Sequence, residues 1–276
     1  MKCIRCNSEH VQKDGEHNGY QRYKCIDCKK RFDYGIYENK IEYTTHFNTQ
    51  IRKSNYNKLT RENYCTPTNK VSSVCKKSLK FSIERCGYKI PNEYYIDENT
   101  YTDKYVKKHC EDCLYNYDLN IKYFSTLDYN EFDKYLKKFI SKNKFKEVID
   151  LKEVNRKDGI YILVLDEYKQ VYIGISNDIK RRILRHWSSI KEFDRLIFGK
   201  KEKSIISIDS FGALDTTRIF YKEIHNFREI YNQEYKLVEE FRDIYKLNRV
   251  AGGINAEENS AIRDLELMGS MKQRKL

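Results

Sequence analysis

The sequence predicts a multidomain α+β protein with a small β-ribbon at the N-terminus, a helical middle region and a C-terminal mixed αβ domain. Three features lead to this fold class: paired cysteines near the N-terminus, a basic segment with apolar residues at helical spacing, and two short apolar runs followed by amphipathic stretches in the second half. A chain of 276 residues is long for one core and suits two or three modules.

Residues 1–38 are expected to form the ribbon around a metal. They contain two Cys-x-x-Cys pairs separated by 18 residues. Each pair turns two sulfurs to one side, and two pairs close a tetrahedron around Zn²⁺. A module this small buries too little apolar surface to fold without the metal. Four thiolates leave no open coordination position, so the zinc is predicted to be structural and bound by Cys3, Cys6, Cys25 and Cys28.

The second half of this ribbon carries the pattern Gln-Arg-Tyr-x-Cys-x-x-Cys-x-x-x-Phe, from Gln21 to Phe32. The pattern resembles the zinc ribbon that begins many insertion-element transposases. The resemblance covers about 35 residues and implies a module that contacts DNA in a mobile-element setting. Zinc ribbons also serve as protein-contact modules, and that alternative stays open.

The positive charge of the chain is concentrated. The net charge is +12, and residues 51–90 hold ten basic and two acidic side chains. Such a patch attracts a polyanion such as nucleic acid. The alternative is a solvated lysine-rich surface.

Neither a membrane span nor export is expected. No apolar run approaches the roughly 20 residues that a membrane helix needs, and the opening MKCIRC is not a signal peptide. Nine cysteines without such a signal indicate reduced thiols. The expected location is the cytoplasm, of a bacterium or phage host, or the nucleus.

Residues 39–92 have the spacing of a basic helix-turn-helix. A short helix is expected to end near Tyr64, and Thr66 and Pro67 to cap and begin the next one. Val71, Val74, Cys75 and Leu79 then form an apolar stripe. Polar and basic side chains on the other faces suit base edges and phosphates. The candidate nucleic-acid-binding residues are Lys70, Ser72, Ser73, Lys76 and Lys77, although any basic amphipathic helix would look similar.

Residues 93–150 are expected to form a helical connector. Cys110 and Cys113 leave two alternatives open. They bind a second zinc ion together with Cys65, Cys75 or Cys86, or they are buried free thiols.

The C-terminal half opens with the stretch GIYILVLDEYKQVYIG, residues 159–174. Residues 159–165 and 170–175 are predicted to pair as a hairpin that places one tyrosine in each arm, Tyr161 and Tyr172. A helix is predicted over 177–187, capped by Asn177 or Asp178. Arg182 and His186 are four residues apart on it and share a face that suits a phosphate. The alternative is an ordinary exposed pair on the protein surface.

A second helix is predicted over residues 229–246. Its apolar stripe consists of Ile230, Leu237, Val238, Phe241 and Tyr245, and Glu234 lies inside that stripe, whereas Glu239 and Glu240 face the polar side. A carboxylate on a packing face needs a compensating partner. The partner is either a divalent metal ion or a neighbouring tyrosine or arginine.

These residues together carry a second resemblance. Gly159-Ile160-Tyr161, Val171-Tyr172-Ile173-Gly174, Arg182, His186, Glu234 in Glu-x-x-Leu-Val, and Asn248 before Ala-Gly-Gly are similar to the GIY-YIG nuclease superfamily. The domain is placed at residues 151–256, with a tail over 257–276. The resemblance implies a mixed αβ fold around a three-stranded antiparallel sheet, whose third strand we expect at Arg218 to Ile224. Asp209 and Asp215 in the preceding segment are expected to cap helices or form turns.

The resemblance also implies hydrolysis of DNA phosphodiesters with one divalent metal ion, Mg²⁺ or Mn²⁺. Glu234 would anchor the metal, Arg182 would neutralise charge on the phosphate, and Tyr161 or Tyr172 would accept the proton of the attacking water. His186 and the other tyrosine would orient that base. The implied catalytic residues are Tyr161, Tyr172, Arg182, His186, Glu234 and Asn248.

The sequence therefore predicts a metal-dependent endonuclease that the N-terminal modules target to double-stranded DNA. A small-molecule substrate is not expected. The alternative is a DNA-binding regulator or mobile-element accessory protein with an inactive nuclease-like domain. Mobility, restriction and repair remain open as settings, as does the oligomeric state.

Overall fold

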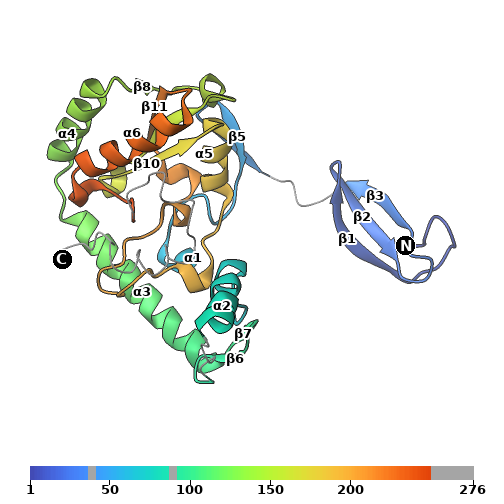
Figure 1. Cartoon of the computed structure of the whole chain (residues 1–276). Helices are drawn as coiled ribbons and strands as arrows, with labels where there is room; N and C mark the ends of the chain where they lie inside the picture. Colours follow the sequence, from blue (N-terminus) through green and yellow to red (C-terminus); the bar gives the residue numbers. More distant parts are fainter. Residues whose placement is uncertain (37–41, 87–91, 250–276) are drawn as a thin grey trace. The chain divides into compact units, whose positions relative to one another are not determined.

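The computed structural model describes residues 1–36, 42–86 and 92–249, which form two compact units (Figure 1). One unit comprises Met1–Thr44 and Ile51–Lys53, and the other Thr45–Gln50 and the described residues from Ser54 onward. No helix in the described ranges is long and apolar enough to cross a membrane.

The first unit is a three-stranded antiparallel sheet in the order β1 (Val11–His17), β2 (Tyr20–Cys25) and β3 (Arg31–Ile36). Asn18 and Gly19 join β1 to β2, and both have positive φ, as a tight hairpin turn requires. Among the residues that the structure describes in this unit, the buried core consists of Cys3, Cys25 and Phe32, with Val11, Tyr23 and Cys28 packed against them. A hairpin of β4 (Tyr43–His46) and β5 (Thr49–Arg52) follows, and the boundary between the units runs through it.

The second unit is built on a four-stranded sheet in the order β10-β9-β11-β8. Its strands are β9 (Gly159–Leu165), β10 (Gln170–Ser176), β11 (Arg218–Glu223) and the two-residue β8 (Lys146–Glu147), and all their pairings are antiparallel. The predicted hairpin and third strand are confirmed. The sheet implied by the resemblance gains β8 as a fourth, edge strand.

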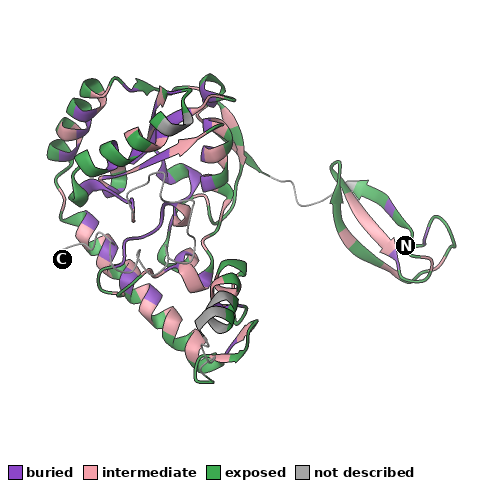
Figure 2. Ribbon diagram, viewed as in Figure 1, coloured by how far each residue is buried: buried purple, intermediate pink, exposed green. Residues whose placement is uncertain are grey.

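The two faces of this sheet pack against different helices. On β9, Tyr161, Leu163 and Leu165 join the cluster that contains Ile179 and Ile183 of α5 (Ile179–Ser188) and Cys113 and Phe124 of α3 (Asp103–Ser125). The alternate residues Ile160, Ile162 and Val164 join the cluster of α4 (Tyr129–Lys142) and α6 (Phe227–Glu240). Because both faces are covered, β9 reads as a continuous apolar run and is buried throughout (Figure 2).

Helix α3 and helix α4 occupy much of the region predicted as a helical connector. Before them, β6 (Tyr95–Asp97) and β7 (Thr100–Tyr101) form a small hairpin. Phe124 on α3 and Phe132, Leu136 and Phe139 on α4 are buried in the clusters that cover the sheet. These helices therefore belong to the core of the second unit.

Helix α1 (Arg61–Tyr64) and helix α2 (Ser73–Cys86) occupy the region predicted as a helix-turn-helix. The predicted helix start at Thr66 and Pro67 is wrong, because α2 begins at Ser73. The preceding backbone pairs with the β6–β7 hairpin instead, through the Lys70–Thr100 bridge and the bond from Val71 N–H to the Asn99 carbonyl.

Short 3₁₀ turns complete the unit: η1 (Leu151–Val154), η2 (Asp166–Tyr168), η3 (Phe193–Arg195), η4 (Ile208–Ser210), η5 (Ala213–Asp215) and η6 (Asp243–Tyr245).

The second predicted C-terminal helix is shorter than expected. It was expected to reach residue 246, but α6 ends at Glu240. Buried Lys246 turns back and donates from Nζ to the carbonyls of Val238 and Phe241, which satisfies acceptors at the end of the helix. Leu247 then donates to the Val171 carbonyl, so the chain runs parallel to β10 at the sheet edge.

Candidate active site and zinc site

The two tyrosines of the hairpin lie side by side because of the strand register. Tyr161 on β9 is opposite Gly174 on β10, and Tyr172 precedes that glycine by two residues on the same face. The rings lie 6.2 Å apart between centroids. A Cβ at position 174 would lie 2.5 Å from the Tyr161 hydroxyl and 2.8 Å from a ring carbon of Tyr172. The glycine therefore provides the space in which the two phenols meet.

His186 on α5 connects Tyr161 to an acidic group. Its Nε2 lies 2.7 Å from the Tyr161 hydroxyl, and its Nδ1 lies 2.7 Å from Oδ1 of Asp209. Asp178 caps the helix by accepting from Arg181 N–H, which confirms one of the two predicted caps. Because α5 begins there, Ile179 and Ile183 face the sheet and His186, only 2% exposed, lies one turn further on the buried side.

The two tyrosines differ in their burial and in the pKa of their hydroxyl groups. Burial raises the pKa of Tyr161 well above its usual value near 10, Tyr172 adds to the rise, and Arg182 lowers it through its charge and a hydrogen bond. Burial raises the pKa of Tyr172 to about 12, with Arg182 opposing the rise and Glu234 adding to it. Tyr161 is completely buried, whereas Tyr172 is partly exposed. Arg182 therefore forms a hydrogen bond with each hydroxyl group and lowers the pKa of both.

Glu234 lies on the packing face of α6, as predicted. It is 8% exposed, between Ile230 at 6% and Leu237 at 5%, while Glu239 and Glu240 are exposed. The carboxylate is close enough to raise the pKa of both tyrosines. The structure therefore brings Tyr161, Tyr172, Arg182, His186 and Glu234 together from two strands and two helices. A partly dehydrated carboxylate of this kind suits Mg²⁺, which takes one or two protein carboxylates and keeps several waters.

Asn248, which the resemblance places among the catalytic residues, bonds the backbone of β10. Its Oδ1 accepts from Ile173 N–H at 3.0 Å, and its Nδ2 donates to the Ile173 carbonyl at 2.7 Å. The side chain pairs with the edge of β10 as another strand would. It therefore supports the strand between Tyr172 and Gly174, and its amide group is not directed at the two phenols.

A pocket of about 650 Å³ opens beside this group of residues. Three arginines of α5 line it, Arg181, Arg182 and Arg185, and Tyr231 of α6 lies on its wall. Asp158 and His225, which are 2.8 Å apart between Oδ1 and Nδ1, line it as well. Arg182 lines this pocket and also interacts with both tyrosines. Its side chain therefore lies between the tyrosines and the open pocket.

Asp209 is the residue that sequence reasoning missed. It was expected to cap or form a turn, and it does lie in the 3₁₀ turn η4, but its carboxylate also accepts from His186, a contact that the sequence did not predict. The expectation is correct for Asp215, which accepts from the N–H groups of Leu59 and Gly212 and from the Tyr168 hydroxyl. The sequence gives no periodic signal for Asp209, because it stands in an irregular segment 23 residues after His186.

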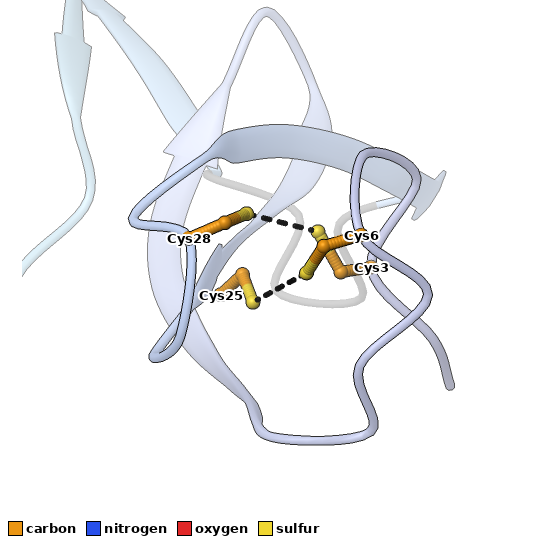
Figure 3. Close-up of side chains that lie close together, drawn as sticks. All are labelled: Cys3, Cys6, Cys25 and Cys28. Carbon is orange, nitrogen blue, oxygen red and sulfur yellow. Dashed lines mark hydrogen bonds between the residues drawn. The ribbon is translucent and has the colours of Figure 1, made fainter.

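The four N-terminal cysteines form a compact group in the first unit (Figure 3). The sulfurs of Cys3 and Cys28 lie 3.5 Å apart and those of Cys6 and Cys25 lie 3.6 Å apart. A tetrahedral Zn²⁺ with bonds of about 2.3 Å needs sulfurs about 3.8 Å apart. The donor set and the spacing fit a structural zinc ion.

The cysteines of the second unit are arranged differently. The sulfurs of Cys65 and Cys110 lie 3.3 Å apart, and Cys113 is fully buried nearby in the same cluster. Cys75 packs near Asp194, and the side chain of Cys86 lies outside the described residues. In the described ranges, no group of three cysteines outside the ribbon has its sulfurs within 4.8 Å of one another.

The candidate nucleic-acid-binding residues lie at and before the start of α2. Lys70, Ser73 and Lys77 are exposed, and Lys76 is half-buried. The Ser72 hydroxyl accepts from Cys75 N–H and its backbone N–H donates to Asp194. Ser72 therefore caps the helix and anchors it to η3.

No curated protein and no solved structure matches the chain. A protein-family model does match, and it covers the part of the chain that holds the tyrosine pair, Arg182, His186 and Glu234. Residues 157–248 match the GIY-YIG catalytic domain, which supports the predicted resemblance and indicates a nuclease-type fold for this part of the chain.

Proposed function

We propose that the protein is a metal-dependent endonuclease that hydrolyses phosphodiester bonds in double-stranded DNA. The observation that carries the proposal is the position of Arg182. It lines the pocket, contacts both phenols, and lies in the same buried group as Glu234. A guanidinium in this position can donate hydrogen bonds to a phosphate in the pocket, and the two phenols lie next to it.

The roles follow from the chemistry of the side chains. Arg181 and Arg185 would hold the sugar-phosphate backbone in the pocket. Arg182 would stabilise the charge that develops on the nonbridging oxygens. One phenol of the pair would accept the proton of the attacking water. A divalent metal ion bound by Glu234, Mg²⁺ or Mn²⁺, would polarise the phosphate and stabilise the departing oxyanion.

The remaining parts of the chain would deliver this site to DNA. A nuclease site holds the backbone and reads little sequence, so target choice must come from attached modules. We assign that role to a zinc ribbon at residues 1–38 and to the basic region at residues 39–92, where Lys70, Ser73, Lys76 and Lys77 are at least partly accessible. Residues 93–150 support the catalytic domain at 151–256, of which residues 250–256 lie outside the described ranges. The ribbon pattern favours a mobile-element setting.

Nicking of a supercoiled plasmid in Mg²⁺ tests the proposal. Glu234→Gln should slow single-turnover nicking by about 10²-fold or more, because a metal ion contributes several kcal/mol to transition-state stabilisation. Glu239→Gln is the matched control, since Glu239 is exposed on the same helix. It should nick at the native rate. Equal rates for Glu234→Gln and the native protein would refute the assigned site.

Complete burial of Tyr161 favours one alternative, a DNA-binding regulator with an inactive nuclease-like domain. The same experiment separates the two functions when DNA affinity is measured beside nicking. Tight binding by the native protein with no nicking in Mg²⁺ or Mn²⁺ would establish the regulator.

A further inference from the structure

The segment between α5 and β11 contributes a carboxylate to the buried site. Asp209 lies in η4, where the Ser207 hydroxyl caps the turn by accepting from Asp209 N–H. From this turn Oδ1 reaches His186 Nδ1 at 2.7 Å, and His186 Nε2 reaches the Tyr161 hydroxyl at 2.7 Å. His186 is 2% exposed and Tyr161 is completely buried. Three titratable groups therefore form a continuous hydrogen-bonded chain whose Tyr161 and His186 are buried, whereas the Asp209 side chain is 31% exposed.

The direction of these hydrogen bonds follows from the chemistry of the groups. The pKa of Asp209 is about 2, since the hydrogen bond from His186 and the nearby Lys191 and Arg182 outweigh the effect of burial, which would raise it. An ionised carboxylate only accepts, so Nδ1 of His186 carries a proton. Burial lowers the pKa of His186, although Asp209 opposes this, and the ring is neutral at neutral pH. Its Nε2 therefore presents a lone pair to the Tyr161 hydroxyl.

We propose that Asp209 is a positioning residue that holds His186 in the tautomer able to take the phenolic proton of Tyr161, which makes Tyr161 the general base of the nuclease reaction. This inference rests on the proposed endonuclease function. The Tyr161 hydroxyl is hydrogen-bonded to Nε2 of His186, which can accept its proton. Tyr161 can therefore accept a proton from water while it gives its own to His186, and it does not need to be ionised beforehand.

The proton balance of the step is complete. As the water oxygen attacks phosphorus, its proton passes to the phenolic oxygen of Tyr161. The phenolic proton passes to Nε2 of His186, so the phenol stays neutral. The resulting imidazolium lies beside the Asp209 carboxylate, which compensates its charge as a triad aspartate does. The water contributes hydroxide to the phosphorus, and the ester oxygen leaves with its electron pair.

This arrangement addresses the high pKa of the phenol. A tyrosine whose pKa is raised well above 10 by burial is a poor base at pH 7. Transfer of the phenolic proton to His186 makes an imidazole the final proton acceptor, and imidazole groups titrate near neutral pH.

Several charged and titratable groups face this chain, and each bears on its pH dependence. They come from β10, α5, the segment that follows α5, and α6. They are Tyr172, Arg182, Arg185, Lys191 and Glu234.

The first test is the tautomer of His186, read from the ¹⁵N chemical shifts of its ring in the free full-length protein without Mg²⁺ or DNA. The signal is assigned with His186→Gln, and His109, which bonds the Phe193 carbonyl, is the internal reference. The native protein should show the proton on Nδ1, and Asp209→Asn should raise the share of the Nε2-protonated form. An Nε2-protonated ring in the native protein would overturn the inference.

The second test is single-turnover nicking. Asp209→Asn should slow the chemical step by about 10²-fold to 10⁴-fold, as loss of a triad aspartate does elsewhere. DNA affinity should stay within about threefold of the native value, and Asp209→Glu should recover part of the rate. A structural role alone would lower affinity and rate together and leave the tautomer unchanged. A native rate in Asp209→Asn would overturn the inference. If the native protein does not nick, the proposed function fails, whereas the tautomer still decides whether Asp209 positions His186.

Discussion

Replacing Gly174 with alanine should disable the site through steric overlap alone. The added Cβ would lie 2.5 Å from the Tyr161 hydroxyl and 2.7 Å from the ring carbon that bears it, whereas ordinary contact begins at 3.4 Å. The hydroxyl must therefore move by about 0.9 Å, the difference between 2.5 Å and 3.4 Å. Its hydrogen bond to His186 is 2.7 Å long, and a shift of that size along the bond would break it.

Two measurements check this prediction. Overpacking of a buried site costs about 1–3 kcal/mol, so the free energy of unfolding in urea should fall by that amount. Trp187 is the single tryptophan of the chain, and its Nε1 donates to Thr216, so its fluorescence reports the unfolding of the second unit. Single-turnover nicking should fall by about 10²-fold or more because the phenol is displaced.

The controls separate displacement of the phenol from loss of stability. Ile173→Val, next in the strand but in the cluster on the other sheet face, should cost about 0.5–1.5 kcal/mol and leave the nicking rate near native. In a Tyr161→Phe background, Gly174→Ala should slow nicking further by less than about threefold, since both changes remove the contact between the Tyr161 hydroxyl and His186. Native stability and native rate in Gly174→Ala would refute the packing argument.

Three further predictions concern the scaffold. Gly159→Ala should lower the free energy of unfolding by about 3 kcal/mol in urea, because its φ is +147° and a Cβ would lie 2.2 Å from the Lys222 carbonyl oxygen; an unchanged midpoint would contradict this. Cys25→Ser should abolish stoichiometric zinc in elemental analysis and leave the Trp187 unfolding midpoint unchanged, and retained zinc would exclude Cys25 as a ligand. Arg218→Met should destabilise the second unit by about 2–3 kcal/mol, because it removes the guanidinium that bridges two half-buried aspartates and leaves Asp133 with Lys137 and Asp166 with the Thr217 hydroxyl. A stability equal to native would show that this bridge contributes nothing.

Local periodicity was enough to predict the parts of the site that lie on regular elements. The hairpin, the cap of α5 and the packing position of Glu234 were predicted correctly because each depends on spacing within one strand or helix. The cysteine group in the ribbon was predicted from the same kind of short-range pattern.

The errors arose where distant backbone competes with local preference. Thr66 and Pro67 have the chemistry of a helix start, yet the residues after them pair with the β6–β7 hairpin, and α2 starts only at Ser73. The apolar spacing of α6 continues past Glu240, but the helix stops where Lys246 folds back onto its last carbonyls. Neither partner can be read from the segment itself.

Asp209 shows the same limit at the site. An aspartate in an irregular segment gives no periodic signal, and only the packing of that segment beside α5 brings it to His186. Asp215 lies six residues later in the same segment and binds backbone N–H groups instead. The two residues have the same chemistry, so their different roles depend on the fold alone.

The positions of the phenols depend on the backbone of the edge strand β10. Gly174 leaves the space for Tyr161, and Asn248 holds the Ile173 backbone between Tyr172 and that glycine through two hydrogen bonds. A shift of β10 by one residue would turn Tyr172 to the opposite face of the sheet and place a side chain against Tyr161. Loss of the Asn248 amide should therefore lower the nicking rate because β10 loses its support, and not because the amide contacts the substrate. Asn248→Leu should lose rate and unfolding free energy together, whereas Asp209→Asn should lose rate with DNA affinity preserved.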